Sequence, residues 1–327
     1  MSEITYLEAI RQAMWDEMER DERVVLLGED VGLYGGAFKV TAGFLEKFGS
    51  ERIIDTPISE EGFTGVAIGA AFNGLRPIVE FQFIDFIANA FNMVTNFAAK
   101  SRYRWGAGVP IVMRGPTGGG VRAGPFHSQN PEMHFVHTPG IKVVVPATVA
   151  DAFGLMKSAI RDEDPILYLE HKKLYRHIKV AAEELAGQEE LVPLGKAAIR
   201  RRGKHIVLIT YGAMLYTALE AAEVLAGESI ELEVIDLRSL VPLDKECILE
   251  AVGRINKVIL LHEDTRTGGM AGEIAAIIVE EAFDDLDGPI RRVTAPDTPV
   301  PYAASLEDAF IPQVEDVVRA ARELFAY

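Results

Sequence analysis

Short apolar runs alternate with longer stretches of helical periodicity along the whole chain, and this alternation limits the fold more than any other feature. In the first half, nearly every residue of these runs is apolar. The runs cover residues 24–27, 77–81, 110–113, 142–145 and 165–169. Because strands without polar alternation are buried on both faces, the pattern predicts a parallel sheet with helices on each side.

Helical periodicity predicts helices at residues 5–20, 86–100 and 148–161 of the first half. Thr5 and Glu8 have the spacing of a capping box, so the first of these helices is expected to begin there.

A second strand–helix series follows an acidic stretch at about residues 180–195, which we interpret as a linker; a surface helix is the alternative. Its expected strands are 205–210, 232–235 and 258–261, and its expected helices are 214–225, 269–283 and 314–324. The sequence therefore predicts an α/β protein of two doubly wound domains, residues 1–185 and 195–327.

The charge balance narrows the range of partners. The 327 residues include 49 acidic and 33 basic side chains, a net charge of −16, which argues against nucleic acid and anionic membranes as partners. A single cysteine, Cys247, excludes an intramolecular disulfide and points to a reducing compartment. With neither a signal peptide nor an apolar run of membrane-spanning length in view, we expect a cytoplasmic protein.

Ligands of open α/β sheets bind beyond the carboxyl ends of the strands, which directs attention to the loops at 28–36, 55–61, 80–86 and 115–129. Glu60 is notable there because the helix that follows it, residues 62–74, is almost free of charge and must be buried. A carboxylate at that position is either a helix cap or a site residue. The neighbouring Glu61 is explained by the helix dipole alone.

The glycine-rich stretch 115–125 allows three interpretations: a phosphate cradle, a mobile active-site loop or a tight bend. The first is disfavoured because Ala123 stands where a dinucleotide fingerprint needs its third glycine. His127 ends this stretch and could act as an acid or base. His134 and His137 are expected to pack or cap, with a zinc pair as the less favoured alternative.

Four aromatic residues, Phe81, Phe83, Phe86 and Phe91, cluster after the second apolar run. Core packing is the simplest explanation, and a platform for a planar ligand is the alternative.

Six motifs occur in order along the chain. They are LGEDVG at 27–32, RIIDTPISE at 52–60, GLRPIVE at 74–80, AAKSRYR at 98–104, HSQ at 127–129 and PGIKVVVP at 139–146. With these motifs the sequence resembles the β subunit of the thiamine-diphosphate-dependent decarboxylating component of 2-oxo acid dehydrogenase complexes. The resemblance extends over essentially the whole chain.

The resemblance implies a transketolase-like pyrimidine-binding domain followed by a transketolase C-terminal-type domain. It also implies an α₂β₂ heterotetramer in which the α subunit holds the diphosphate and Mg²⁺ of the cofactor through a Gly-Asp-Gly motif. That motif does not occur in this chain, as expected for a subunit that carries half of a site.

By position, the resemblance gives four residues roles in the site. Glu60 matches the glutamate that hydrogen-bonds the aminopyrimidine ring of thiamine diphosphate, and Phe86 matches the aromatic residue that stacks on it. Gln82 is expected to line the same pocket. His127 matches a histidine that binds substrate or assists acyl transfer to lipoamide.

The resemblance further implies a structural potassium ion held by backbone oxygens, which would come from Ile111, Ala159, Asp162 and Asp164. It also implies a lipoyl acyltransferase core as a partner of the C-terminal domain. Acidic residues near Glu307, Asp308, Glu315 and Asp316 could dock that core, or they could simply form a solvated helix face.

The expected function is oxidative decarboxylation of a 2-oxo acid with reductive acylation of lipoamide, active only with an α subunit. The sequence leaves open whether the acid is pyruvate or a branched-chain 2-oxo acid. A β subunit of acetoin dehydrogenase and a non-catalytic assembly subunit that recruits the core are the alternatives.

Overall fold

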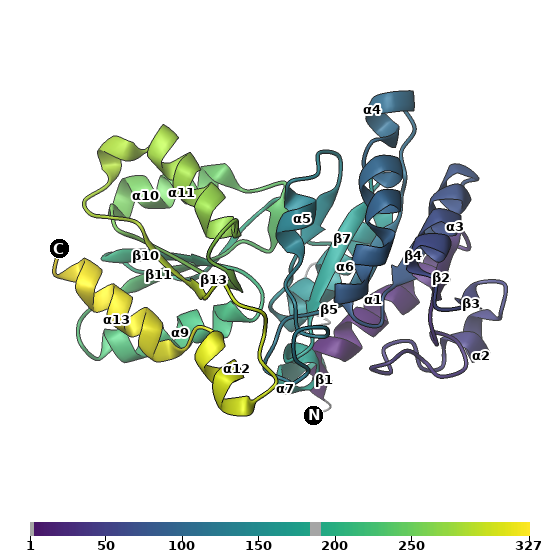
Figure 1. Cartoon of the computed structure of the whole chain (residues 1–327), viewed down its shortest axis with the longest axis horizontal. Helices are drawn as coiled ribbons and strands as arrows, with labels where there is room; N and C mark the ends of the chain where they lie inside the picture. Colours follow the sequence, from purple (N-terminus) through teal and green to yellow (C-terminus); the bar gives the residue numbers. More distant parts are fainter. Residues whose placement is uncertain (1–2, 184–190) are drawn as a thin grey trace. The chain divides into compact units, whose positions relative to one another are not determined.

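A computed structural model describes residues 3–183 and 191–327, so the centre of the predicted linker lies outside the described residues. The chain forms two compact units (Figure 1). Unit 1 comprises Met1–Thr117 and His134–Leu194, and unit 2 comprises Gly118–Met133 and Gly195–Tyr327. The chain thus enters unit 2 for a short segment, returns to unit 1, and enters unit 2 again near residue 195.

Unit 1 contains the parallel sheet that the apolar runs predict. Its strands lie in the order β6-β7-β5-β4-β2-β3, and each neighbouring pair is parallel. The strands are β2 (Val24–Gly28), β3 (Ile53–Asp55), β4 (Arg76–Glu80), β5 (Val112–Thr117), β6 (Lys142–Val144) and β7 (Ile166–His171). All residues of β2, β4, β5 and β7 are buried, as expected for strands covered on both faces.

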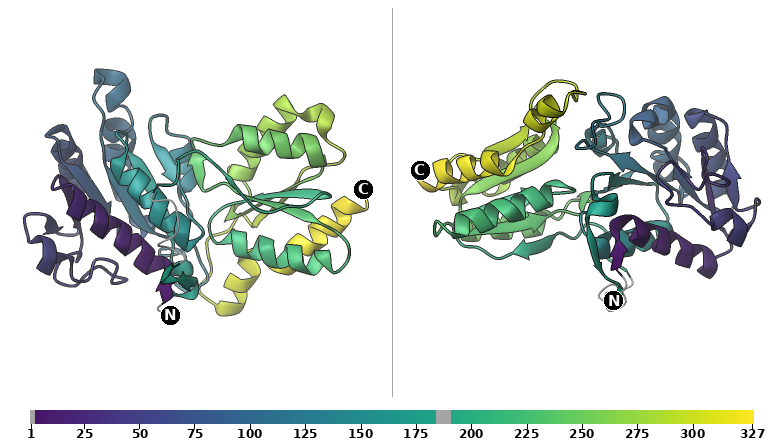
Figure 2. Two further views of the ribbon diagram at one scale, coloured as in Figure 1. Left: turned by 180° about the vertical axis from the view of Figure 1, so that it is seen from behind. Right: turned by 90° about the horizontal axis from the view of Figure 1, so that it is seen from below.

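Helices α1 (Tyr6–Arg20), α3 (Glu60–Phe72) and α6 (Val149–Arg161) are the longest helices of unit 1. The predicted capping box is present, since the Glu8 amide donates to Thr5 Oγ1 and the Thr5 amide donates to Glu8 Oε2. Helices α1 and α6 lie side by side in both rear and lower views (Figure 2). The shorter elements are β1 (Glu3–Thr5), α2 (Phe44–Phe48), α4 (Ser101–Trp105), α5 (Glu132–Val136), α7 (Leu174–His177) and β8 (Lys179–Ala181).

The single α-helix predicted over 86–100 is wrong in type. The chain there forms a 3₁₀ helix, η1 (Ile84–Ala90), and then a π-helical segment, η2 (Met93–Ala98). Side chains compete for the backbone in this region: Thr95 Oγ1 donates to the Phe91 carbonyl at 2.7 Å, and Ser101 Oγ donates to the Phe97 carbonyl at 2.5 Å. Such back-bonding disturbs regular α-helical geometry.

Unit 2 is built around a second sheet in the order β14-β13-β10-β11-β9. Its strands are β9 (Ala198–Arg201), β10 (Ile206–Thr210), β11 (Leu232–Asp236), β13 (Val258–Thr265) and β14 (Arg291–Ala295). All pairs are parallel except β9 with β11. Figure 1 shows α10 (Lys245–Ile255) and α11 (Met270–Glu281) on one face and α9 (Met214–Ala226) and α13 (Val314–Phe325) on the other. The remaining elements are β12 (Ser239–Val241), η3 (Phe283–Asp285) and α12 (Ala304–Phe310).

Each sheet has a point at which the strand order reverses. In unit 1, β2 lies between β3 and β4, so the chain leaves β2 to one side and later returns to its other side. In unit 2, β10 lies between β11 and β13 in the same way. Ligands of open α/β sheets bind at such switch points, beyond the carboxyl ends of the strands. Among the helices of residues 3–183 and 191–327, none is long and apolar enough to cross a membrane.

Candidate active site

The carboxyl end of β2 delivers two acidic residues to the switch point of unit 1. Glu29 follows Gly28 directly and is 7% exposed, and its Oε1 has no hydrogen-bond partner among the described residues. Burial, followed by the charges of Glu60 and Asp30, raises the pKa of the Glu29 carboxyl. An unpartnered buried carboxylate is costly, so this oxygen is available to a ligand that offers a hydrogen-bonding atom.

Glu60 is the first residue of α3 and is also 7% exposed. The Ser59 side chain makes no capping bond to the helix. Asn89 Nδ2, on η1, donates to Glu60 Oε2 at 3.2 Å. Because Glu29 interacts electrostatically with Glu60, the structure brings a pair of acidic groups to the end of β2 and the start of α3.

Gln82 and Phe86 follow β4, the strand beside β2. Gln82 Nε2 donates to Asp30 Oδ2 at 3.1 Å, which ties the loop after β4 to the loop after β2. The half-buried Phe86 lies three residues before Asn89 on the 3₁₀ helix η1, so the two side chains are on one side of it. Three predicted site residues, Glu60, Gln82 and Phe86, therefore lie around the switch point of unit 1.

The predicted aromatic cluster is partly a core cluster. Phe81 is 1% exposed and packs against Phe63 with ring centroids 5.6 Å apart. Phe83 and Phe86 form an edge-to-face pair at 6.3 Å, and Phe83 also contacts Phe38 at 5.5 Å. Phe86 is the member of the Phe83–Phe86 pair nearer in sequence to Asn89, the partner of Glu60.

A buried ionic cluster supports the strands beneath the site. Arg114 of β5 is 1% exposed and pairs with Glu80 of β4 and Glu170 of β7. Its Nη2 donates to Glu170 Oε2 at 2.6 Å, and the Tyr175 hydroxyl donates to the same oxygen at 2.7 Å. Burial opposes the charge of Arg114, but the two carboxylates outweigh burial and hold its pKa well above the usual value.

Three residues of the site did not emerge from the sequence as individual candidates: Glu29, Asp30 and Asn89. The first two stood inside a loop that the strand pattern placed at a crevice, and an acidic pair directly after a buried strand was the available signal. Asn89 carried no signal, because its bond to Glu60 depends on the 3₁₀ geometry of η1.

His127 belongs to unit 2, in the segment 118–133. It is half-buried, and its amide donates to the Gly124 carbonyl at 3.3 Å. This segment lies at the switch point of unit 2, because the Tyr211 hydroxyl, just after β10, donates to Glu132 Oε1 at 2.8 Å. Glu263 of β13 accepts from the Gly119 amide at 2.6 Å.

The groups around that second switch point have strongly shifted pKa values. Burial, followed by the charge of Asp264, raises the pKa of Glu132 to about 8. Burial also raises the pKa of Asp264 to about 6 and lowers that of His262 to about 4. At pH 7 the Glu132 carboxyl is therefore largely protonated and the His262 imidazole is neutral.

The residues expected to bind potassium lie at the turn between α6 and β7 and beside the start of β5. They are Ile111, Ala159, Asp162 and Asp164. Cations of the chain already contact this turn: Arg76 donates to the Asp162 carbonyl, Lys142 Nζ lies 2.6 Å from Asp162 Oδ2, and Arg102 pairs with Asp164. A carbonyl has two lone pairs, so these bonds leave acceptor capacity on the backbone oxygens.

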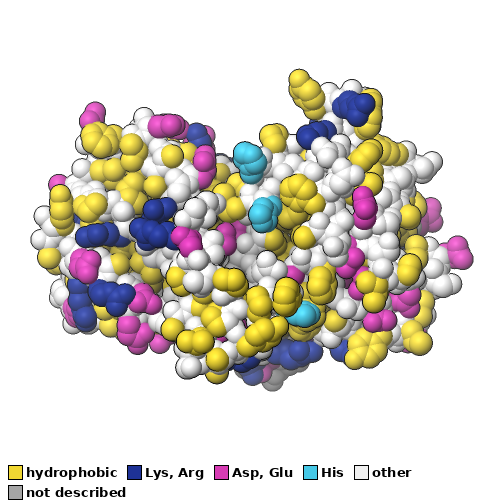
Figure 3. Space-filling view, in the orientation of Figure 1, with side chains coloured by type: hydrophobic (Ala, Val, Ile, Leu, Met, Phe, Trp, Pro, Cys, Tyr) yellow, Lys and Arg dark blue, Asp and Glu magenta, His cyan; other side chains and the backbone are white. Residues whose placement is uncertain are grey.

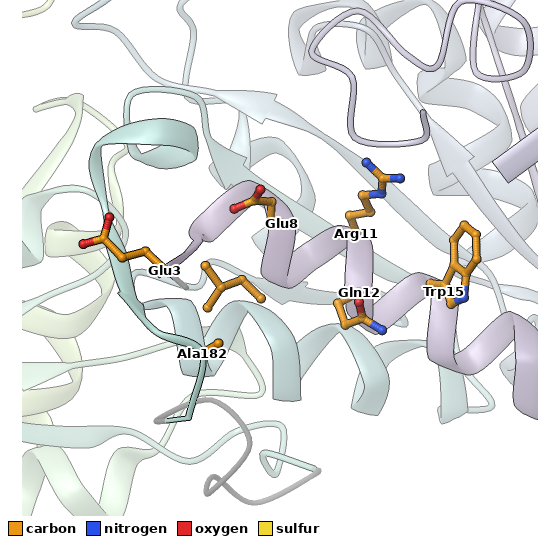
Figure 4. A pocket seen from close by; sticks show the side chains of 7 residues that line it. Glu3, Glu8, Arg11, Gln12, Trp15 and Ala182 are labelled. Atoms are coloured by element: carbon orange, nitrogen blue, oxygen red, sulfur yellow. The ribbon is translucent and has the colours of Figure 1, made fainter. Parts of the chain in front are cut away.

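His134 and His137 are both exposed, and the His134 carbonyl accepts from Thr138 Oγ1 at 2.9 Å. Within the described part of the chain, no three His, Cys, Asp or Glu side chains are grouped to hold a metal ion. A cavity of about 450 Å³ lies along α1, between Glu3, Trp15 and Ala182 (Figure 4). It contains none of the predicted site residues, and its Glu8 is engaged in the capping box.

Three of the four acidic residues named for docking pair with arginines. Glu307 is fully buried and pairs with Arg122, which also pairs with Asp308. Asp316 pairs with Arg319, which lines a cavity of about 580 Å³ together with three further arginines, Arg266, Arg291 and Arg292. Figure 3 shows basic side chains gathered on the face of unit 2. The burial of Glu307 corrects the expectation that this residue docks a partner, whereas Glu315 is exposed.

Comparisons with known proteins agree with the two units. Residues 2–178 match the family model for the transketolase pyrimidine binding domain, and residues 195–317 match the model for the transketolase C-terminal domain. A solved structure, "Split gene transketolase, inactive beta4 tetramer", superposes with a TM-score of 0.81 at 23% identity, covering 99% of this chain and 98% of that one. At this identity the likeness shows the two-domain α/β fold alone.

Curated relatives are much closer in sequence. The 2-oxoisovalerate dehydrogenase subunit beta of Bacillus subtilis is 50% identical over 329 residues, covering 99% of each chain. The pyruvate dehydrogenase E1 component subunit beta of Rickettsia felis is 45% identical over 327 residues, again covering 99% of each. These matches span both units, and they confirm the resemblance found in the motifs. The chain belongs to the family of beta subunits of 2-oxo acid dehydrogenase E1 components.

Proposed function

We propose that this chain, together with an α subunit in an α₂β₂ heterotetramer, catalyses thiamine-diphosphate-dependent oxidative decarboxylation of a 2-oxo acid and reductive acylation of lipoamide on an acyltransferase core. The acid is pyruvate or a branched-chain 2-oxo acid, as the names of the relatives suggest. The proposed domains are residues 1–185 and 195–327. The low cysteine content supports a cytoplasmic location.

The observation that carries the proposal is the acidic pair at the switch point of unit 1. Glu29 offers a buried oxygen that lacks a partner in the described structure, and Glu60 has a neutral amide, Asn89, as its nearest donor. Among the described residues, no cation pairs with either carboxylate, whereas Arg114 pairs with the Glu80 and Glu170 carboxylates below them. These groups fit a ligand that presents ring nitrogens and an amino group, such as an aminopyrimidine.

Bound thiamine diphosphate would supply a carbon nucleophile for attack on the 2-oxo acid. Glu60 would hold a proton on its carboxyl and share it with a ring nitrogen of the pyrimidine. Burial and then the charge of Glu60 raise the pKa of the neighbouring Glu29, because two adjacent carboxylates repel each other. Phe86 would stack on the ring and Gln82 would line its edge, which orients the pyrimidine.

His127 would bind the substrate or assist acyl transfer to lipoamide. The α subunit would hold the diphosphate and Mg²⁺. A structural potassium ion on the backbone oxygens of Ile111, Ala159, Asp162 and Asp164 is part of the proposal, since the polar turn after α6 offers carbonyl oxygens with spare lone pairs.

Exchange of Glu60 for glutamine tests the proposal. Glu60→Gln keeps the size of the side chain and removes the acidic proton, so we expect the heterotetramer to lose about 100-fold or more of its decarboxylation rate. Glu61→Gln is the matched control, because it removes the same charge from the adjacent, exposed residue of α3; its rate should stay within about twofold of the wild type.

The assay uses the co-purified α and β subunits with pyruvate, branched 2-oxo acids and acetoin. A near wild-type rate in Glu60→Gln would contradict the catalytic role of this chain and leave a subunit that only recruits the core. Turnover of acetoin alone would show that the substrate class is wrong.

A further inference from the structure

The glycine-rich segment of unit 2 has a regular backbone alternation. Every second residue from Gly118 to Gly124 has a positive φ: 80° at Gly118, 81° at Gly120, 62° at Arg122 and 71° at Gly124. Backbone amides of this segment, those of Gly119, Gly120 and Arg122, donate to carboxylates, so the segment acts as an anion-binding nest. Of the three sequence interpretations, phosphate cradle, mobile active-site loop and tight bend, this backbone has the concave amides of the first within a tight turn of the chain.

Two buried carboxylates of unit 2 fill this nest. The Gly119 amide donates to Glu263 Oε1 at 2.6 Å, and the Gly120 amide donates to Glu307 Oε1 at 3.0 Å. The Arg122 amide donates to Glu307 Oε2 at 3.2 Å. Glu263 is 6% exposed and Glu307 is fully buried. The anion that the loop binds is thus supplied by the chain itself, which leaves these amides no place for a phosphate.

Glu307 binds the glycine-rich segment at Arg122, its one non-glycine residue with a positive φ. Arg122 is not a glycine, and a positive φ is unfavourable for it. Its amide and its Nη1 both donate to Glu307 Oε2, the latter at 2.7 Å. Its Nη2 donates to Asp308 Oδ1 at 2.7 Å, but Asp308 receives no backbone amide of the segment in the described contacts. The carboxylate of Glu307 therefore stabilises a backbone conformation, whereas that of Asp308 binds a side chain.

The same backbone leads directly to His127. Gly124 packs so closely on Tyr302 that an added Cβ would lie 2.1 Å from its ring, and the Gly124 carbonyl accepts from the His127 amide. The Gly118 amide donates to the Gln129 carbonyl at 3.2 Å and closes the loop. The backbone around His127 is consequently fixed on both sides by the nest.

We propose that Glu307 is a positioning residue, which holds the nest at residues 118–124 and thereby sets the backbone that carries His127. This inference rests on the role of His127 in the proposed function. Glu307 lies in α12, far from His127 in the sequence, and would affect turnover without touching the reacting atoms.

Glu307→Gln tests the inference in the α₂β₂ enzyme. Both carboxylate oxygens accept from donors, so the amide nitrogen of glutamine must face an N–H group of Arg122 or Gly120. We expect faster hydrogen exchange across residues 118–133 and a fall in kcat of about tenfold or more. Asp308→Asn is the matched control, since it removes one charge from the next residue; its exchange and its kcat should stay close to the wild type.

A double variant separates positioning from general loosening. If Glu307 acts through His127, Glu307→Gln should have almost no further effect on kcat in a His127→Ala background. Additive losses would overturn the positioning role, and so would wild-type exchange over 118–133 in Glu307→Gln. Full activity of His127→Ala would instead refute the role of His127 in the proposed function, and the positioning role would fall with it.

Should Glu307→Gln not fold, Arg122→Gly provides a second test. Glycine suits a φ of 62°, so the amide of residue 122 can keep its bond to Glu307 while the side-chain bonds to Ala304, Glu307 and Asp308 are lost. Exchange at residues 119–122 should then remain slow. Rapid exchange there would show that the arginine side chain, and not the nest, holds the segment.

Discussion

Both units have buried carboxylates at the switch points of their sheets, but these carboxylates differ in their hydrogen-bond partners. At the switch point of unit 1, Glu29 has an oxygen without a partner among the described residues and Glu60 contacts an amide. At that of unit 2, Glu263 and Glu307 accept backbone amides from a segment of the same chain. The carboxylate of Glu29 thus keeps a hydrogen-bonding oxygen unused within the described structure, whereas Glu263 and Glu307 are bound by backbone amides.

This difference shows why a fold alone does not identify a site. Both crevices lie beyond the carboxyl ends of parallel strands, and both contain acidic groups with raised pKa values, Glu29 in unit 1 and Glu132 in unit 2. What separates them is whether the hydrogen-bonding capacity of those groups is used. To tell two similar crevices apart, one must therefore identify the hydrogen-bond partner of each buried polar atom in them.

The largest effect on stability is expected where a buried carboxylate of unit 1 loses its cation. Arg114→Met leaves Glu80 and Glu170 buried without their partner, which should lower the free energy of unfolding by about 3–5 kcal/mol. Urea unfolding of the full chain measures this change. Arg102→Met, which breaks a half-exposed pair with Asp164, should cost no more than about 1 kcal/mol. Equal losses would show that the buried carboxylates of unit 1 do not depend on pairing.

A smaller effect is expected where the glycine-rich segment of unit 2 packs against Tyr302, which precedes α12. Gly124→Ala combines an unfavourable φ of 71° with a clash against Tyr302, so it should destabilise the chain by about 2–4 kcal/mol. Gly49→Ala is the control, because Gly49 has a φ of 76° with nothing within 4 Å of an added Cβ. It should cost about 1 kcal/mol from strain alone. If the two variants match in thermal unfolding, the segment does not pack tightly in its crevice.

The smallest of these effects depends on pH. The pKa of Glu132 is about 8 in the folded chain against 4.5 for the free group, so the folded state binds more protons between these values. The stability that this group contributes is present below about pH 4.5 and is lost as the pH rises through about 8.

Glu132→Gln removes this titration. Glutamine can still accept from Tyr211, so the variant should exceed the wild type in stability at pH 9 by about 1 kcal/mol or more, with a smaller difference at pH 6. Unfolding curves at both values measure the difference. The exposed Glu51→Gln should show no such trend, and a parallel pH dependence of Glu132→Gln and wild type would contradict the burial of a neutral carboxyl.

Much of the fold could be predicted from the sequence because the strands are local and apolar. The runs at 24–27, 77–81 and 165–169 correspond to β2, β4 and β7. The helix type of the interval 86–100 could not be predicted; side-chain bonds such as that of Thr95 to Phe91 accompany its π-helical segment. Hydrophobic periodicity does not distinguish these helix types.

A residue of the candidate site could be predicted only where neighbouring residues in the sequence make it unusual. Glu60 stood out because an uncharged helix follows it, and the structure buries it beside Glu29. Glu307 was misjudged as a surface residue, because its partners Gly120 and Arg122 lie 187 and 185 residues away along the chain. Such contacts are set by topology, and a local pattern of acidic residues does not contain them.

The double passage of the chain between its units has a consequence for folding autonomy. A fragment that starts at residue 195 would keep every strand that the structure describes in the sheet of unit 2, yet it would lack residues 118–133. Two buried carboxylates and the Tyr211 hydroxyl would then face solvent without the amides and carboxyl that they bind. The complementary fragment, which ends before residue 195, would contain the glycine-rich segment without Glu263 and Glu307, the carboxylates that its amides bind. The interval between the two family models, residues 179–194, is therefore not the only place where the chain passes between the units, because residues 118–133 also belong to unit 2.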